Sequence, residues 1–504
     1  MTVTGVSPNI APLIQSVLDV NKELDTLQQQ LSSGQKSQTY GGLGAQSGVV
    51  VALNAQLAAM GSYDDAISLV GTNVSLQQQV LQQIASTAST VQGATVQQFG
   101  SFSLNGNGQT TVQQSAQDQL DQMLSALNTQ GGNGYLFSGS GLDQPSVDTA
   151  DHILNGNGAA AGLKQVIAER NQADLGADGL GRLVIPAAAG ATLSVSEDVA
   201  GSPFGLKLAA VNSSLTNATV SGPSGSPPAI SVDLSGGNPN NGDAITFTFN
   251  LPDGTMQTLS LQATTSATPG PNQFSIGATP AATAANLQAA LTSGVSQIAS
   301  TSLSAASAMA AANNFFDDPP QRVAGPPFDT ATALVNGTAA DTVMWYTGND
   351  AAGSIRASQT ARIDQTTAVA YGTQANEQGI RWLVQNVAAL AATSYSPSNA
   401  NAQASYSALS QRVYNALAVP SGVQNITDIE ASLANVQNAM SAAQSQHAQT
   451  KNTLTDMLQS IEGVDTTQIG AQILSLQTIL QASLSTTARL SQLNLLAYLA
   501  PVTG

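Results

Sequence analysis

Both ends of this sequence carry apolar residues that recur with alternating spacings of three and four positions, and this pattern constrains the fold more than any other feature. Such alternation is typical of a helix that packs a narrow apolar stripe against other helices. We therefore expect the chain to begin with a long packed helix. Its stripe, the N-terminal seam, consists of Val6, Ile10, Leu13, Val17, Val20, Leu24, Leu27 and Leu31.

The far end of the chain repeats the pattern. Residues 426–464 keep the same alternation, which predicts a helix roughly 57 Å long at 1.5 Å per residue. A last helix follows and closes with "LNLLAYL", where apolar residues offer more surface than one partner helix covers. Its stripe, the C-terminal seam, consists of Ile469, Ile473, Leu476, Leu480, Leu484, Leu493 and Leu496.

A polar run rich in serine and glycine, "QLSSGQKSQTYGGLG" at residues 30–44, follows the N-terminal seam. After it a second seam begins at Val50, and a third, in shifted register, extends from Tyr63 to Val91. The polar run therefore predicts an interruption between two helical segments.

Between the helical ends, from about residue 145 to 350, proline and glycine are dense. The segment "ITFTFNLPDGTMQTLSLQAT" alternates every second residue on each side of Pro252, Asp253 and Gly254, which predicts a β-hairpin. Thr279 before Pro280 suits the cap and first turn of a short helix. The expected fold is mainly α, with long terminal helices in a coiled-coil bundle interrupted by a central α+β, β-rich insert.

These patterns divide the chain into three regions. Residues 1–144 form the first helical region, residues 145–340 the variable insert, and residues 341–504 the second helical region. Because the insert interrupts one bundle, we expect the two helical regions to pack together.

Charge narrows the classes of partner. Only 9% of residues are charged, and the formal net charge is −17 with thirteen Lys and Arg residues in the whole chain. Phosphate binding needs clustered basic side chains, so we expect no nucleic acid and no anionic membrane as a partner.

The first twenty residues lack a basic leader, and no run of eighteen apolar residues occurs. Export, if it happens, is expected to proceed without a cleavable signal peptide.

Catalytic and metal-binding patterns are lacking. There is no cysteine, and the two histidines are isolated: His447 falls on a seam position, and His152 stands in "TADHILNG", which is typical of a turn. The segment "GGNPNNGD" has oxygen ligands for calcium but a single carboxylate, Asp243. We expect no catalytic residue, no cofactor and no metal site, and therefore no enzyme.

Several segments resemble the bacterial flagellin family. They are "LQQQLSSGQKSQT", "GGNGYLFSGSGLDQPSV", "WYTGND", "TARID", "VAYGTQANEQGIRWLVQNVAALAA" and "ILSLQTILQASLSTTARLSQLNLLAYL". The resemblance covers about residues 5–144 and 340–499. The family includes the filament subunit and the hook-associated protein that joins hook to filament.

The resemblance implies a self-assembling structural subunit of the flagellar filament that serves swimming motility. The terminal segments would form the coiled-coil core of an extracellular tube, with the insert projecting outward. Implied partners are copies of the same chain, hook-associated and cap proteins, an export chaperone and the flagellar type III export apparatus. "YLFSG" and "YTGND" favour the junction protein as an alternative. A secreted adhesin with a simple helical bundle is a further alternative.

One short stretch bears on recognition by animal cells. The family segment recognised by the innate flagellin receptor resembles "LQRIRELAVQ", and the matching stretch here is "LQQIASTAST" at residues 81–90. Leu81 and Ile84 match, whereas Gln83 and Ala85 stand where that pattern has arginines. The resemblance therefore implies weak recognition by this receptor.

Overall fold

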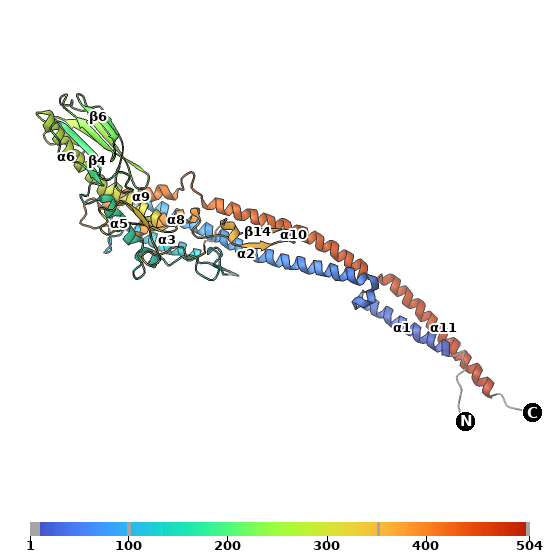
Figure 1. Ribbon diagram of the computed structural model, residues 1–504. Coiled ribbons are helices and arrows are strands. Elements are labelled where there is room, and N and C mark those ends of the chain that lie inside the picture. Colours follow the sequence, from blue (N-terminus) through green and yellow to red (C-terminus); the bar gives the residue numbers. More distant parts are fainter. Residues whose placement is uncertain (1–10, 98–101, 133, 350–352, 500–504) are drawn as a thin grey trace, which may run out of the picture. The chain divides into compact units, whose positions relative to one another are not determined.

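The computed structural model describes residues 11–97, 102–132, 134–349 and 353–499 (Figure 1). The chain divides into two compact units. The terminal unit comprises Met1–Ser68, Arg362–Ala368 and Ala439–Gly504, and the central unit comprises Leu69–Ala361 and Val369–Asn438. The predicted fold class, mainly α with long terminal helices and a β-rich centre, is confirmed.

Four long helices carry the predicted seams. They are α1 (Ala11–Ser33), α2 (Ser47–Gln97), α10 (Ile426–Glu462) and α11 (Thr466–Leu499). The second and third seams lie on one uninterrupted helix, α2, and the stripe predicted over residues 426–464 lies almost wholly on α10. Val6 and Ile10 lie outside the described residues.

The predicted interruption separates α1 from α2, although its second half is a short 3₁₀ helix, η1 (Tyr40–Gln46). Gly34 and Gly44 have φ values of 71° and 58°, a backbone region that favours glycine. Lys36 meets the end of α10, where its backbone N–H donates to Glu462 O at 2.6 Å and its Nζ donates to Ile461 O at 2.8 Å. The break after α1 is thereby bonded to the break before α11.

Shorter helices build the helical part of the central unit. They are α3 (Thr111–Leu127), α4 (Ala150–Asn155), α5 (Leu163–Leu175), α7 (Ser304–Phe315), α8 (Gln378–Ala392) and α9 (Ala402–Leu417). Helix α3 packs on α8, and α7 packs on α5, α8 and α9. Helix α4 corrects one expectation: His152 lies in this helix, capped by Thr149, and not in a turn. Two short helices complete the set, η2 (Ala299–Leu303) and η3 (Ile355–Ser358).

Two four-stranded sheets and α6 (Pro280–Ile298) form the β-rich part of the insert (Figure 1). One sheet has the order β3-β4-β7-β6, with bounds Leu183–Val184, Thr192–Glu197, Ala229–Asp233 and Thr219–Ser224. The other has the order β10-β9-β8-β5, with bounds Gln273–Ser275, Met256–Thr264, Ala244–Asn250 and Lys207–Ser213. Buried side chains from both sheets and α6, among them Val195, Phe247 and Leu291, share one core.

The insert confirms both local predictions made from its sequence. Strands β8 and β9 pair antiparallel around the predicted turn, where Gly254 has φ 80°. Helix α6 begins at Pro280 with Thr279 as its cap, and the Thr279 hydroxyl accepts from the Ala282 N–H. Small two-stranded ladders complete the chain: β1 (Gln130–Gly131) with β2 (Gly134–Tyr135), β11 (Gln321–Val323) with β12 (Leu334–Asn336), and β13 (Thr360–Arg362) with β14 (Ala368–Ala370).

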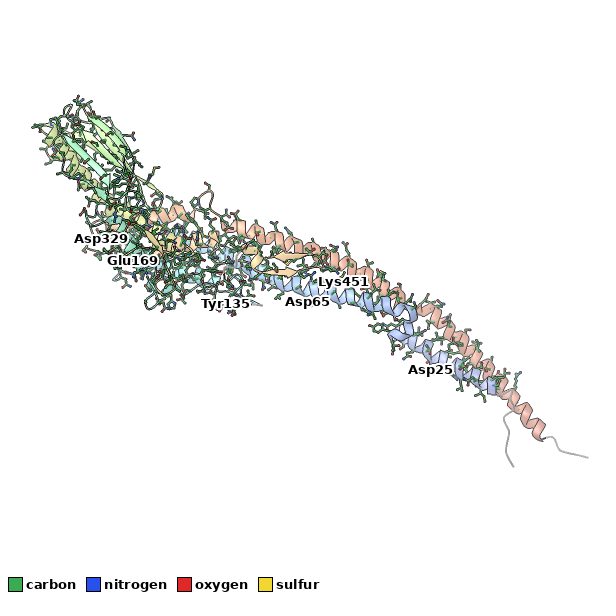
Figure 2. The ribbon with its side chains drawn as sticks, in the orientation of Figure 1. Asp25, Asp65, Tyr135, Glu169, Asp329 and Lys451 are labelled. Atoms are coloured by element: carbon green, nitrogen blue, oxygen red, sulfur yellow. The ribbon has the colours of Figure 1, made fainter. Side chains whose placement is uncertain are left out.

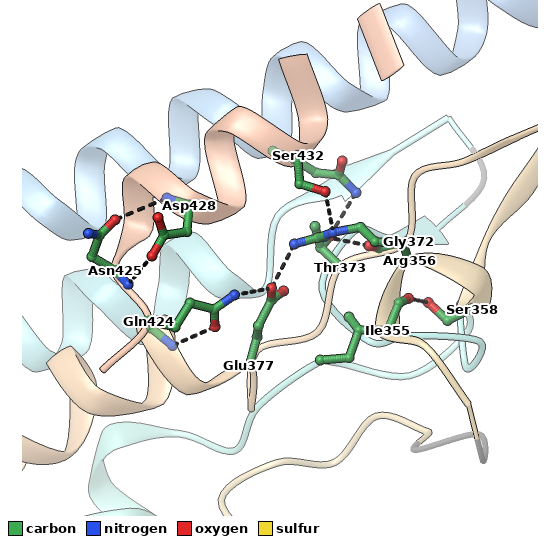
Figure 3. A network of polar contacts seen from close by, with 12 residues as sticks. Ile355, Arg356, Ser358, Gly372, Thr373, Glu377, Gln424, Asn425, Asp428 and Ser432 are labelled. Atoms are coloured by element: carbon green, nitrogen blue, oxygen red, sulfur yellow. Dashed lines mark hydrogen bonds and ion pairs between the residues drawn. The ribbon is translucent and has the colours of Figure 1, made fainter. Parts of the chain in front are cut away.

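A polar network fixes the start of α8 and of α10 in the central unit (Figure 3). Arg356 donates to Glu377 Oε1 at 2.6 Å, to Gly372 O at 2.7 Å and to Ser432 Oγ at 3.1 Å. Gln424 also donates to Glu377 Oε1, at 3.0 Å. Burial raises the pKa of Glu377, and Arg356 and Gln424 offset only part of that rise. The loop after η3 and the first turns of two helices are therefore held by one buried ion pair.

Candidate assembly interface

Helices α1 and α11 lie side by side in the terminal unit (Figure 1). Their contact is narrow: Leu27, Ile469 and Ile473, each 8% exposed, form its buried centre, with Val464 and Leu476 packed against it. A seam of one stripe per helix gives this kind of contact, because only one face of each helix meets the other.

The predicted seams differ along their length in how far they are covered. Leu24 is buried like Leu27, whereas Leu13, Val17, Val20, Leu476 and Leu480 are half-buried. Leu31 is 41% exposed and Leu484 is 52% exposed, so neither is covered within the chain. Leu493 and Leu496 belong to α11, but their side chains lie outside the described residues. The assignment of these residues to assembly contacts stays a prediction.

Further apolar side chains on the same two helices are exposed. Ile14 and Leu18 on α1 are 48% and 56% exposed, and Leu474 and Ile479 on α11 are 67% and 50% exposed. Our sequence reasoning assigned one stripe per helix and missed these four residues, although the spacing of four between Ile14 and Leu18 signals a second helical stripe. Exposed apolar patches of this kind mark surfaces for other proteins.

Within the terminal unit, a polar cluster joins α2 to α10. Asp64 accepts from His447 Nδ1 at 2.7 Å, and Lys451, labelled in Figure 2, also donates to this carboxylate. His447 is 2% exposed, as its seam position predicts, and its Nε2 lies 4.0 Å from Asp364 Oδ1. Burial raises the pKa of Asp64, but the hydrogen bonds and charges of Lys451 and His447 outweigh it and hold that pKa below its usual value. Local sequence patterns did not indicate this pairing, since 383 positions separate Asp64 from His447.

Asp465 precedes α11 in the terminal unit and caps its first turn. Its carboxylate accepts from the backbone N–H of Thr467 at 2.9 Å and of Gln468 at 3.2 Å. These bonds satisfy N–H groups that the first turn of a helix leaves free, and they hold the pKa of Asp465 below its usual value. The C-terminal seam thus starts from a fixed helix end.

Three of the sequence motifs meet in the central unit. Residue Gly139 of "YLFSG" forms a β-bridge with Asn349 of "YTGND", and the Asn349 N–H donates to Ser138 O at 2.9 Å. The Ala375 N–H, in "VAYGTQAN", donates to Phe137 O at 2.9 Å. The buried amide of Gln77 on α2 donates to Thr373 Oγ1 at 2.8 Å. The motifs are therefore one structural unit, although more than 200 positions separate "YLFSG" from the other two in sequence.

The stretch matched to the receptor pattern lies on α2. Leu81 and Ile84 are fully buried, Gln83 is exposed and Ala85 is half-buried. Of the two positions where the pattern has arginines, Gln83 is open to a partner. Weak recognition by the receptor stays a prediction.

Two family models match the chain. The bacterial flagellin N-terminal helical region matches residues 10–141, and the bacterial flagellin C-terminal helical region matches residues 417–499. The chain belongs to the bacterial flagellin family. The flagellin family forms the extracellular filament of the bacterial flagellum by self-polymerisation, and its members are structural proteins and not enzymes. Comparison with curated proteins gives no significant match.

Two further properties of this flagellin-family chain concern membranes and metals. By length and composition, the segment Tyr40–Val96 is long and apolar enough to cross a membrane, a test that packed helices of soluble proteins also meet. Within the described part of the chain, no group of three or more histidine and carboxylate side chains is placed to hold a metal ion.

Proposed function

We propose that this chain is the main subunit of the flagellar filament and that α1 and α11 are its assembly surface. The observation that carries the proposal is the set of apolar side chains on these helices that the chain itself leaves uncovered, above all Leu18, Leu474 and Leu484. Burying such side chains contributes about 25 cal/mol per Å² of apolar area, so contact between copies is favourable.

The geometry of such contacts favours a tube. A subunit that presents one stripe to a neighbour and receives the neighbour on a different stripe makes heterologous contacts, which propagate helically when the rotation does not close. The N-terminal and C-terminal seams hold α1 against α11, and the uncovered residues of both helices are left for neighbouring subunits.

We further propose that the insert projects outward and takes no part in the lattice. The sheets and α6 have a core of their own. A Cβ added at Gly181 would lie 2.9 Å from Leu303, so the chain enters and leaves this part at nearby points. Elements α5 and α7, inside the 145–340 range, pack against each other, and α7 also packs against α8 and α9.

Deleting residues 182–302 and joining the ends by a short glycine linker is therefore a sharper test than deleting the whole insert, and polymerisation should survive it. Loss of assembly by a folded deletion protein would place the insert in the lattice.

The assembly surface is tested with matched surface substitutions. Purified monomer carrying Leu474→Ser and Ile479→Ser should keep its helical circular dichroism but fail to polymerise on filament seeds. A control carrying Val184→Ser and Met256→Ser, two exposed apolar residues of the insert, should polymerise like the unmodified protein. Normal polymerisation of the α11 variant would refute the role assigned to this face.

The hook-associated junction protein is the second candidate, favoured by the "YLFSG" and "YTGND" motifs that meet at Gly139 and Asn349. Electron microscopy of cells without the gene separates the two candidates. Absence of filaments supports the main subunit, whereas shed filaments with intact hooks support the junction protein. A secreted adhesin would differ from both, because its terminal helices would resist protease equally before and after any polymerisation.

Export and assembly partners follow from the same proposal. We expect the flagellar type III apparatus, with its chaperone, to export the chain without cleavage of a signal peptide, and hook-associated and cap proteins to adjoin it in the flagellum. Mass spectrometry of sheared filaments should find the N-terminal peptide of the printed sequence, with or without its first methionine. A shortened N-terminus would contradict this route.

A further inference from the structure

The central unit contains a cavity of about 540 Å³ beside α7, α8 and α9 and the turn of the β8–β9 hairpin. This volume falls within the range of about 300–1,000 Å³ that is usual for small-molecule sites. Its wall contains no residue of either seam. Five amide side chains take part in lining it: Asn313, Asn314, Gln385, Asn386 and Asn415.

Both guanidinium groups at the cavity are neutralised within the protein. Arg412 donates to Asp253 Oδ2 at 2.7 Å, and both residues line the cavity. Arg170 donates to the buried Asp174 at 2.8 Å and stacks on the Phe204 ring at 4.9 Å. An anionic ligand would therefore find no uncompensated positive charge here, and the chemistry of the wall favours an uncharged ligand.

Trp382 of α8 supplies an aromatic surface. Its indole N–H donates to Ala416 O of α9 at 2.7 Å, which fixes the ring and uses its only polar atom. The half-buried ring therefore offers carbon and π surface to the cavity. An aromatic face of this kind packs against C–H groups of a ligand.

Two buried amides on α8 have acceptors that lack partners. Asn386 is 2% exposed; its Nδ2 donates to Trp382 O at 2.6 Å, and no other described residue bonds its Oδ1. Gln385 is 4% exposed; its Nε2 lies 3.4 Å from Asn313 Oδ1, and its Oε1 has no partner among the described residues. The Oε1 of Gln385 is a buried acceptor without a partner, which is costly, and the terminal torsion of a Gln side chain turns easily. Hydroxyl donors on a ligand would satisfy both oxygens.

We propose that this cavity binds a neutral saccharide, because it joins an aromatic surface, unsatisfied amide acceptors and internally paired charges in one small-molecule-sized space. The C–H face of a sugar ring would lie on Trp382, and its hydroxyls would donate to Asn386 and Gln385. The exposed Asn313 and Asn415 would contact hydroxyls nearer the solvent. This function is additional to filament assembly and does not depend on it.

Two binding measurements on the full-length monomer test the proposal. Isothermal titration uses glucose, galactose, mannose and N-acetylglucosamine as free sugars, and a mixed glycan array presents chain-terminal sugars. We expect saturable binding of at least one neutral sugar at millimolar concentration or below. Asn386→Leu should weaken it about tenfold or more, the effect of losing one hydrogen bond between a ligand hydroxyl and an amide acceptor. Trp382→Leu should weaken it further. Binding on the array alone would assign the site to glycan chains, and binding of free sugar would assign it to the monosaccharide.

Matched controls separate binding from folding. Asn171→Leu removes another amide oxygen without a partner among the described residues, but Asn171 lines a different cavity, so binding should not change. Asp253→Asn leaves Arg412 without its carboxylate, so this variant should gain affinity for glucuronate, which the unmodified protein should bind weakly. The proposal is overturned if no neutral sugar binds, or if Asn386→Leu folds normally and binds as well as the Asn171→Leu control.

Discussion

The two units of this chain bury their apolar residues in opposite ways. In the central unit, two sheets and α6 enclose a core in which Phe247, Leu287 and many other side chains are fully buried. In the terminal unit, the α1–α11 contact has a buried centre of three side chains, and most of the exposed large apolar residues of the described chain belong to this smaller unit. The difference teaches that the central unit is stabilised from within, whereas the terminal helices keep apolar surface that the chain itself does not cover.

Removing the last twenty residues, from Ser485 on, should have the largest effect on this contrast. The truncated protein should remain a soluble monomer and should not polymerise, because it loses "LNLLAYL", whose sequence offers more apolar surface than one partner helix covers. Sedimentation and electron microscopy measure the outcome. The 182–302 deletion is the matched control, since it removes far more chain but no part of α1 or α11. Filaments formed by the truncated protein would show that the terminal unit completes its burial elsewhere.

Phe247→Ala should have the opposite consequence, because it should destabilise the central unit and leave assembly unchanged. The side chain is fully buried between the sheets and α6, so its loss should lower the free energy of unfolding of this part by about 3–5 kcal/mol. Calorimetry of the monomer measures the loss, and assembly below the lowered melting temperature should be unchanged. Met256→Ala, at a residue 70% exposed, should change stability by less than about 0.5 kcal/mol. A Phe247→Ala protein that is stable but fails to assemble would break the comparison.

The exposed face of α2 in the central unit offers a third test. Gln83 lacks the rigid guanidinium fork, so we expect the monomer to be weaker than a standard flagellin on receptor reporter cells by a factor on the order of a hundred. Gln83→Arg with Ala85→Arg should restore part of the signal. Ser75→Arg with Gln79→Arg, at exposed positions of the same helix, should not. Equal potency of the unmodified monomer would refute the alignment of this stretch.

Acid should destabilise the terminal unit through Asp64, and this is the smallest effect we expect. The pKa of Asp64 in the folded chain lies below its ordinary value of 3.8, so its stabilising contribution is fully present above 3.8 and is lost as the pH falls through the lower, folded value. Asp64→Asn should therefore be less stable at neutral pH and should lose less stability in acid than the unmodified protein. Thermal unfolding followed by circular dichroism between about pH 5 and about pH 3 measures both slopes. Asp65→Asn, at the exposed neighbouring position, is the control, and an acid response of Asp64→Asn equal to that of the control would contradict the role of this carboxylate.

Local patterns were sufficient to predict the elements of this chain. Periodicity located the stripes of α1, α2, α10 and α11, and the residues Asp253 and Gly254 located the hairpin turn, because helix and turn geometry depends on neighbours a few positions away. The sheet with the order β3-β4-β7-β6 was missed, although "TLSVSE" and "AISVD" carry its alternation in β4 and β7. The short helix that contains His152 was mistaken for a turn, because six residues are too few for a periodic signal.

Only the tertiary structure decided which of these residues meet. It paired Asp64 with His447 and Lys451, joined "YLFSG" to "YTGND", placed Arg412 against Asp253 at the cavity, and left Leu31 and Leu484 uncovered although they continue the seams. An apolar stripe in the sequence predicts that a residue faces a partner, since the spacing determines the side of the helix on which it lies. The identity of that partner depends on contacts between segments hundreds of positions apart, which local spacing does not encode. For the terminal helices, the spacing itself determined that apolar surface needs cover, and the fold determined how much of it the chain covers alone.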